Sequence, residues 1–296
     1  MKLDYNILWV DDRIEERPFQ RILESTKEYL INENFNCQII SAKEYNEFIE
    51  RYKSQNEFDL IITDYTLNNG TLGNQVIDYV RDNEHNNTEV FFYSAQTDIN
   101  DIKLFSNSRI TFFQLTEGDY KELEHEIFDV IHQTIKKFQH IIAMRGMIMN
   151  ETSSLDIEFT EILENIITSD ENALKKIRDR YKKFNSDNIE KADDLLLNEL
   201  LYKIGASHRW KGLKENIAKD DFHQILLDYE KDIIITRNKF AHAILQEDET
   251  GRKYFKDKQD GIDFNDDACK IIRQNILKHK SNLTNLRSTY CSKKEN

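Results

Sequence analysis

The chain has 296 residues, 32% of them charged, with 41 Lys and Arg residues against 54 Asp and Glu residues and a formal net charge of −13. With only 8 Gly and 1 Pro it is expected to be helix-rich, its 3 Cys match no metal spacing and are expected to be reduced, and no stretch reaches the ~18 uninterrupted apolar residues of a membrane span. The length predicts two domains, and the N-terminus lacks a signal-peptide pattern, so we expect a cytoplasmic protein without a membrane partner.

Charge is unevenly distributed along the chain. Residues 1–140 carry 14 Lys and Arg residues and 26 Asp and Glu residues, a net charge of −12, whereas residues 141–296 carry 27 and 28. The first part therefore repels polyanions. If the protein binds nucleic acid, we expect the second part to make the contact.

The first half of the chain alternates strand-like runs with amphipathic segments. The runs lie at 6–10, 37–41, 58–63, 90–93 and 110–113, with amphipathic segments between them at 18–31, 43–54 and 73–82. Short apolar runs between helices are typical of parallel strands that are buried on both faces. The pattern predicts a doubly wound α/β domain with a five-stranded parallel sheet over residues 1–135.

Three carboxylates follow two of these predicted strands. Asp11 and Asp12 come directly after the first strand, and Asp64 comes at the end of the third. The carboxyl ends of parallel strands meet at one edge of a sheet, so these groups should converge and repel one another. A bound hard cation relieves such repulsion, and the sequence predicts Mg²⁺ at this edge.

This constellation resembles the receiver domain of response regulators over about residues 4–135. The matching residues are Asp11 and Asp12 after the first strand, Asp64 after the third, Ser94 after the fourth, and Gly73 in the loop that follows Asp64. The resemblance implies that Asp64 accepts a phosphoryl group from an upstream histidine kinase.

The resemblance also implies roles for the residues around Asp64. Asp12 and Asp64 bind Mg²⁺ directly, with the backbone carbonyl of Thr66 as a third ligand. Asp11 acts on the ion through water, and the Ser94 hydroxyl hydrogen-bonds the phosphoryl group.

The end of the fifth predicted strand departs from the receiver pattern. A receiver carries a lysine there, whereas this chain places Gln114 at that position. An amide has no charge to pair with phosphoryl oxygens. Three interpretations stay open: a receiver that still takes phosphate, a pseudo-receiver used for dimerisation or partner docking, and a doubly wound domain whose acids converge by coincidence.

A helical pattern continues past the predicted sheet. Apolar residues recur every three or four positions at Leu123, Ile127, Ile131, Ile135, Phe138 and Ile142. The first of these should cover the sheet, and residues 136–146 should form a connecting helix that contacts another helix. We expect Gly146 to break the helix and therefore place the second domain at 147–296.

The second half of the chain shows helical periodicity throughout and predicts an all-α bundle. The segments lie at 155–167, 171–184, 191–204, 221–245 and 264–287. Thr250 and Gly251, between the last two segments, predict a small hairpin or excursion. Within 221–245, Arg237 and His242 lie about 140° apart around a helix axis, so their side chains splay. Four neighbours on this segment are expected in the core: Ile233, Ile234, Phe240 and Ile244.

The run from Arg237 to His242, with Asn238 after the arginine, resembles the Arg-x4-His motif of the HEPN superfamily of helical-bundle domains. The resemblance covers about residues 147–290. It implies a bundle that dimerises, so that two facing motifs form a ribonuclease site that needs no metal or other cofactor.

The same resemblance assigns chemistry to the three residues. His242 moves protons between the ribose 2′-OH and the leaving 5′-oxygen, Arg237 stabilises the developing phosphate charge, and Asn238 orients His242 or binds a phosphate oxygen. RNA would be cut to a 2′,3′-cyclic phosphate and a 5′-hydroxyl. The predicted function is a receiver-regulated, homodimeric endoribonuclease, which would suit stress or phage-defence signalling.

Two alternatives to cleavage stay open. In the first, Arg237 and His242 are structural residues at a helix end. In the second, the chain is a non-catalytic signalling adaptor whose two domains mediate dimerisation and partner binding. Weaker candidates for RNA contact form one short run, in which a Trp ring is available to stack on a base: His208, Arg209, Trp210 and Lys211.

Overall fold

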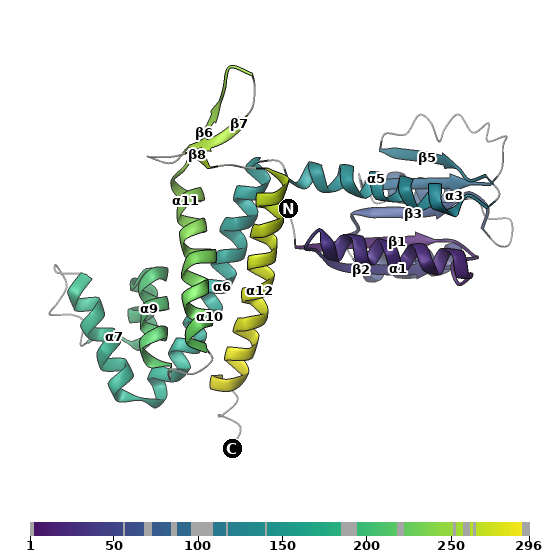
Figure 1. Cartoon of the computed structure of the whole chain (residues 1–296). Coiled ribbons are helices and arrows are strands. Elements are labelled where there is room, and N and C mark those ends of the chain that lie inside the picture. Colours follow the sequence, from purple (N-terminus) through teal and green to yellow (C-terminus); the bar gives the residue numbers. More distant parts are fainter. Residues whose placement is uncertain are drawn as a thin grey trace. The chain divides into compact units, whose positions relative to one another are not determined.

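The computed structural model divides the chain into two compact units, Met1–His140 and Ile141–Asn296 (Figure 1). It describes residues 3–55, 57–67, 73–83, 88–95, 109–116, 118–139, 141–184, 194–217, 222–250, 253–256, 261–262 and 265–291. Among these residues, no helix combines the length and the apolar character needed to cross a membrane.

The first unit is a doubly wound α/β domain. Its strands are β1 (Asp4–Val10), β2 (Asn36–Ala42), β3 (Leu60–Asp64), β4 (Glu89–Ser94) and β5 (Ile110–Gln114). They form one sheet in the order β2-β1-β3-β4-β5, and every pairing is parallel. This is one of the two common strand orders of doubly wound folds, so the predicted fold class of the first half is confirmed.

Helices cover both faces of this sheet because its strands are apolar on both sides. The helices are α1 (Arg17–Asn32), α2 (Tyr45–Ser54), α3 (Gly73–Asp78), which continues into a π-helical turn at Tyr79–Asn83, and α5 (Tyr120–Phe138). One core joins α1 and α5 to the side chains of Tyr5, Ile7 and Trp9. The second core joins α2 and α3 to Leu8 and Val10. Successive residues of β1 thus point to opposite faces, as a strand requires.

The second unit is mainly helical. Its elements are α6 (Ile141–Ser169), α7 (Glu171–Phe184), α8 (Leu197–Lys203), α9 (Ala206–Asn216), α10 (Phe222–Tyr229), a π-helical segment (Glu230–Ile235), α11 (Thr236–His242), β6 (Ile244–Glu247), β7 (Lys253–Lys256), β8 (Gly261–Ile262) and α12 (Asp266–Cys291). The three strands form a small antiparallel sheet, so the hairpin prediction is confirmed. Helices α6, α11 and α12 pack side by side, which confirms the predicted helical class (Figure 1).

The boundary between the units differs from the predicted one. Helix α5 ends at Phe138 and α6 starts at Ile141, so residues 136–146 do not form one connecting helix. Helix α6 also runs through Gly146 without a break. A glycine costs a helix only about 1 kcal/mol, which packing along a helix of 29 residues outweighs. The apolar stripe ends earlier than expected, since Ile135 is buried and Ile142 is 57% exposed.

The predicted helix at 221–245 is likewise interrupted. A π-helical segment divides α10 from α11, and the chain turns from helix into strand β6 after His242. Ile233, Ile234 and Phe240 are buried as expected. The prediction for Ile244 is wrong, because this residue begins the hairpin and is 69% exposed.

Candidate functional site

The carboxylates of Asp11, Asp12 and Asp64 meet at the carboxyl edge of the five-stranded sheet. One oxygen from each lies within 4.8 Å of the others. Asp11 follows β1 and Asp64 ends β3, and these strands are neighbours in the sheet. Asp11 and Asp64 are buried, whereas Asp12 is half-buried. The sheet therefore brings together the three acids that the sequence placed at its strand ends.

Burial and mutual repulsion make this cluster costly when it carries its full negative charge. Burial, followed by the neighbouring Asp11, raises the pKa of Asp64 to about 7. Burial also raises the pKa of Asp11, although a hydrogen bond from Tyr93 opposes the shift. Three carboxylate oxygens at this spacing suit a hard divalent cation, whose charge offsets the repulsion. The donor set therefore fits the Mg²⁺ ion that the sequence predicts.

A buried chain of hydrogen bonds orients Asp11. The Tyr93 hydroxyl donates to Asp11 Oδ2, and the Trp9 indole N–H donates to the Tyr93 oxygen at 3.1 Å. Both ring side chains are fully buried in the sheet. Sequence analysis did not identify this series of hydrogen bonds, because Trp9 and Tyr93 lie on β1 and β4 among other core residues. These hydrogen bonds hold Asp11 Oδ2 in place, and the Arg13 backbone N–H donates to Oδ1 at 2.7 Å.

Gly73 brings the start of α3 close to the end of β3. The Thr66 backbone N–H lies 3.4 Å from Asp64 Oδ1, and the Gly73 N–H donates to the Tyr65 carbonyl at 2.7 Å. A Cβ on Gly73 would lie 2.2 Å from the carbonyl oxygen of Asp64. Only glycine allows α3 to start this close to the strand end. Coordination of Mg²⁺ by the Thr66 carbonyl remains a prediction.

Ser94 and Gln114 end the neighbouring strands β4 and β5 and are partners in the register of that pair. Ser94 is buried, and its carbonyl accepts a hydrogen bond from the Leu115 N–H at 2.8 Å. Gln114 is exposed at the sheet edge. The structure thus places an uncharged amide at the end of β5, where the receiver resemblance called for a lysine.

Arg13 is a member of this site that sequence analysis missed. Its Nη2 lies 3.4 Å from Asp64 Oδ2. The guanidinium carbon also lies 5.4 Å from the centre of the Phe19 ring. The signal in the sequence was an arginine directly after the acidic pair, but only the folded β1–α1 loop shows which carboxylate it faces.

The Arg-x4-His motif lies on α11, and its three residues do not point the same way. Asn238 and His242 are exposed. Arg237 is half-buried and lines a cavity of about 10 Å³ together with Asp156, Trp210 and Tyr229. Its Nε is buried and has no hydrogen-bond partner among the described residues. One copy of the chain therefore brings Asn238 and His242 to a common exposed face but turns Arg237 toward the interior of the helical unit.

The run at 208–211 differs from the expected RNA contact. Trp210 is buried, and its indole N–H donates to the Leu226 carbonyl at 2.7 Å, so its ring is not available to stack on a base. The Arg209 guanidinium pairs with Asp156, with Nε 3.2 Å from Oδ1, and donates to the Leu201 carbonyl at 3.0 Å. Both side chains hold α9 in the bundle. His208 and Lys211 are half-buried on the same helix, and their contact with RNA remains a prediction.

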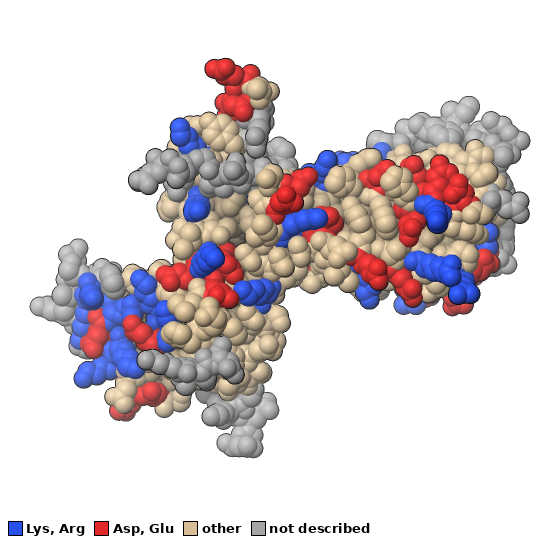
Figure 2. Space-filling model, viewed as in Figure 1, with Lys and Arg blue, Asp and Glu red and all other residues tan. Residues whose placement is uncertain are grey.

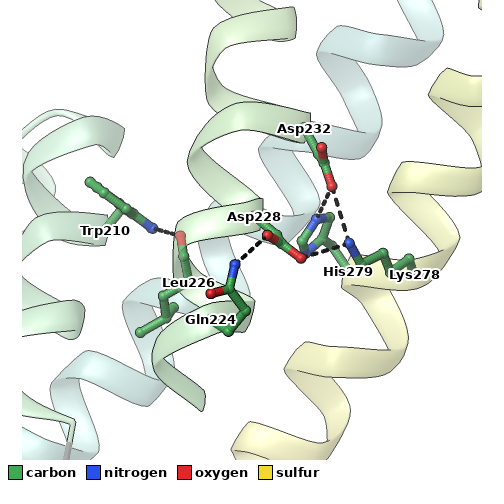
Figure 3. A network of polar contacts seen from close by, with 7 residues as sticks. All are labelled: Trp210, Gln224, Leu226, Asp228, Asp232, Lys278 and His279. Atoms are coloured by element: carbon green, nitrogen blue, oxygen red, sulfur yellow. Dashed lines mark hydrogen bonds and ion pairs between the residues drawn. The ribbon is translucent and has the colours of Figure 1, made fainter. Parts of the chain in front are cut away.

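A polar network joins α12 to the helix that precedes the motif (Figure 3). Asp232, in the π-helical segment, is contacted by His279 Nε2 at 3.1 Å and by Lys278 Nζ at 3.3 Å. Lys278 also reaches Asp228 at 3.0 Å. His279 is fully buried, and burial lowers its pKa. Sequence analysis missed this network, which anchors the π-helical segment directly before α11.

Comparisons with known proteins find similarity among solved structures. No family model and no curated protein matches the sequence. Among solved structures, the chain is similar to one described as the crystal structure of the signal receiver domain of an HD domain-containing protein from Pseudomonas fluorescens Pf-5. The match has 16% sequence identity and a TM-score of 0.32, and it covers 45% of this chain and 98% of that one. The fold assignment given above rests on the strand order and register.

Proposed function

We propose that this chain is a signalling protein whose first unit acts as a receiver, binding Mg²⁺ at Asp12 and Asp64 and taking a phosphoryl group on Asp64. The observation that carries the proposal is the meeting of three acidic side chains within 4.8 Å at the carboxyl edge of the sheet. A buried cluster of this kind lowers the stability of the fold. A role in binding a cation and a phosphoryl group explains why the fold retains it.

The chemistry follows from the position of Asp64. A carboxylate oxygen of Asp64 attacks the phosphorus of a phosphohistidine on a kinase, the phosphorus–nitrogen bond breaks, and the imidazole leaves with the bonding electron pair. The product is an acyl phosphate on Asp64. The Ser94 hydroxyl ends the neighbouring strand and would hydrogen-bond one phosphoryl oxygen. When bound, Mg²⁺ supplies positive charge that offsets the charge of the carboxylates and the phosphoryl group.

Incubation with acetyl phosphate and Mg²⁺ tests this proposal by intact-protein mass spectrometry. The wild-type chain should gain the mass of one phosphoryl group, and Asp64→Asn should gain none. Asp129→Asn is the matched control, because Asp129 is an exposed acid on α5. Absence of labelling in the wild-type chain would instead favour the pseudo-receiver, used for docking.

A second candidate function concerns the helical unit, and we propose it as the output of the protein. Two copies of the chain would pool Asn238 and His242 to cleave RNA without a metal. Two observations favour it. Both side chains are exposed one helical turn apart at the end of α11. Lys and Arg side chains also gather over α7 and α9, on a protein that is otherwise acidic (Figure 2).

Arg237 sets the main requirement for this candidate. Arg237 is half-buried and lines a small cavity of the helical unit, so this candidate requires its guanidinium to move toward the shared site. Without that movement, the helical unit would serve as a docking module and the chain as a signalling adaptor.

Incubation of the full chain with RNA in EDTA separates the two outputs. Cleavage to 2′,3′-cyclic phosphate ends should be lost in His242→Ala and kept in His223→Ala, a half-buried histidine on α10 of the same unit. DNA of the same sequence should stay intact because it lacks the 2′-OH. If the wild-type chain cuts no RNA, with or without acetyl phosphate, the adaptor alternative is favoured.

A further inference from the structure

The acidic pocket lacks a cation at the position where the receiver resemblance predicts one. Asp11, Asp12 and Asp64 converge, and the neighbouring strand β5 ends in the uncharged Gln114. An acyl phosphate on Asp64 would add further negative charge to this edge. A positive side chain from another element would stabilise this phosphorylated pocket in addition to the bound ion.

We propose that Arg13 supplies this charge: it pairs with Asp64 in the metal-free protein and binds a phosphoryl oxygen once Asp64 is phosphorylated. The inference rests on the proposed receiver function. Among the described residues, Arg13 is the one cation whose ion pair with the acidic cluster the structure shows, with Nη2 3.4 Å from Asp64 Oδ2. Lys43, which follows β2, is paired with Glu15 at 2.6 Å instead.

The backbone of the β1–α1 loop positions Arg13. The backbone N–H of Arg13 donates to Asp11 Oδ1 at 2.7 Å, and the backbone carbonyl of Arg13 accepts from the Glu16 N–H at 2.8 Å. The Ile14 N–H also bonds to the Asp11 carbonyl at 3.2 Å. The residue that bears the guanidinium is thus tied at both ends to a turn that starts at the acidic cluster.

The side chain of Arg13 has a second support. Its guanidinium carbon lies 5.4 Å from the centre of the Phe19 ring, and Phe19 is fully buried at the start of α1. A cation over an aromatic face is held without using its N–H donors. Guanidinium has five such donors in a planar fork, so Arg13 can contact Asp64 and a phosphoryl oxygen together. Its side chain is 37% exposed, which leaves it open to an incoming ligand.

The contacts of Arg13 determine which helices a phosphoryl group on Asp64 would affect. A lysine on β5 would connect the phosphoryl group to the edge of the sheet, whereas Arg13 connects it to α1. The Phe19 ring packs edge-on against Tyr120 with their centres 5.4 Å apart, and Tyr120 is the first residue of α5. Helix α5 is the last element of the first unit. The contacts Arg13–Phe19–Tyr120 thus join the pocket to the helix that leads toward the second unit in the sequence.

Calorimetric titrations with Mg²⁺ alone, and with beryllium trifluoride in saturating Mg²⁺, test the proposal on the full-length chain. In Arg13→Ala, affinity for beryllium trifluoride should fall by roughly ten- to hundredfold, the effect of losing a hydrogen bond to a charged group. Affinity for Mg²⁺ alone should rise, because no guanidinium competes for Asp64. Arg13→Lys should restore part of the affinity for beryllium trifluoride. Gln114→Ala is the matched control and should change neither value appreciably.

The opposite signs of the two effects separate the proposed role from a structural one. If Arg13 only stabilises the loop, both affinities fall together, and the proposal is overturned. It is also overturned if Gln114→Ala, and not Arg13→Ala, loses the phosphoryl analogue. Wild-type protein that binds Mg²⁺ but no beryllium trifluoride would refute the receiver function itself, before any variant is compared. Arg13→Gln keeps the length of the side chain and gives the same test if Arg13→Ala fails to fold.

Discussion

Replacing Asp64 by Asn should make the metal-free first unit more stable at alkaline pH. Burial and the nearby Asp11 raise the pKa of Asp64 from 3.8 to about 7 in the folded chain. A carboxyl whose folded pKa is raised binds its proton more tightly in the folded state than in the unfolded state. Its ionisation therefore costs stability, and the cost grows as pH rises from about 4 to about 7.

The structure sets the size of this effect. Moving the pKa of a carboxyl from 3.8 to about 7 corresponds to ~4 kcal/mol of unfolding free energy once the group is ionised. This value already includes the attraction between Asp64 and Arg13, which lowers the pKa of Asp64. We therefore expect Asp64→Asn to gain about 4 kcal/mol at pH 8 and much less at pH 4.

Hydrogen exchange of peptides from β1 and β3 measures the stability of the first unit within the full chain. In EDTA, protection of these strands in the wild type should fall between pH 5 and pH 8, after correction for the intrinsic exchange rate. This fall should be much smaller in Asp64→Asn and unchanged in Asp129→Asn. Saturating Mg²⁺ should restore protection in the wild type at pH 8. Equal pH dependence in the wild type and Asp64→Asn would refute the reasoning.

Four further predictions concern the metal site, two glycines and a buried histidine. Mg²⁺ affinity of the wild type, measured by calorimetry, should rise from pH 6 to pH 8, because Asp64 must lose its proton to bind the ion; constant affinity over this range would contradict the raised pKa. Gly73→Ala should destabilise the first unit by roughly 1–3 kcal/mol in urea unfolding, because its Cβ would lie 2.2 Å from the Asp64 carbonyl oxygen. Gly146→Ala should stabilise the second unit by ~0.5–1 kcal/mol, because nothing lies within 4 Å of the added Cβ. Equal effects of the two substitutions would argue against the close contact between Gly73 and the end of β3. Burial lowers the pKa of His279, so protonation favours the unfolded state and the helical unit should lose stability as pH falls below about 6.5. As pH falls, α12 should lose less protection from hydrogen exchange in His279→Gln than in the wild type. An identical loss in both proteins would mean that other groups cause the pH dependence.

The local pattern of the sequence was sufficient to predict the sheet and the acidic cluster. Strand-like runs between amphipathic segments imply parallel strands, and parallel strands have their carboxyl ends on one edge. Asp11, Asp12 and Asp64 were therefore expected to meet before any contact was known, and they do. The angle of about 140° between Arg237 and His242 around the helix axis could also be predicted, because it depends only on the geometry of a regular helix.

Contacts between distant segments decided the rest. A helical wheel separates Arg237 from His242, but only the packing of α11 against its neighbours turns Arg237 inward and leaves His242 exposed. Gly146 was predicted to break a helix, yet a preference worth about 1 kcal/mol is outweighed by packing along α6.

The ion pair between Arg13 and Asp64 in the candidate site could not be predicted from the sequence either. Nothing in the residues near it in sequence indicates a carboxylate 51 positions away, and the pair exists because β1 and β3 are neighbours in the sheet. The sequence by itself determined which residues reach the edge of the sheet, since periodicity is a local property of the chain. Which side chains then pair, and which point inward, depends on contacts that only the tertiary structure creates.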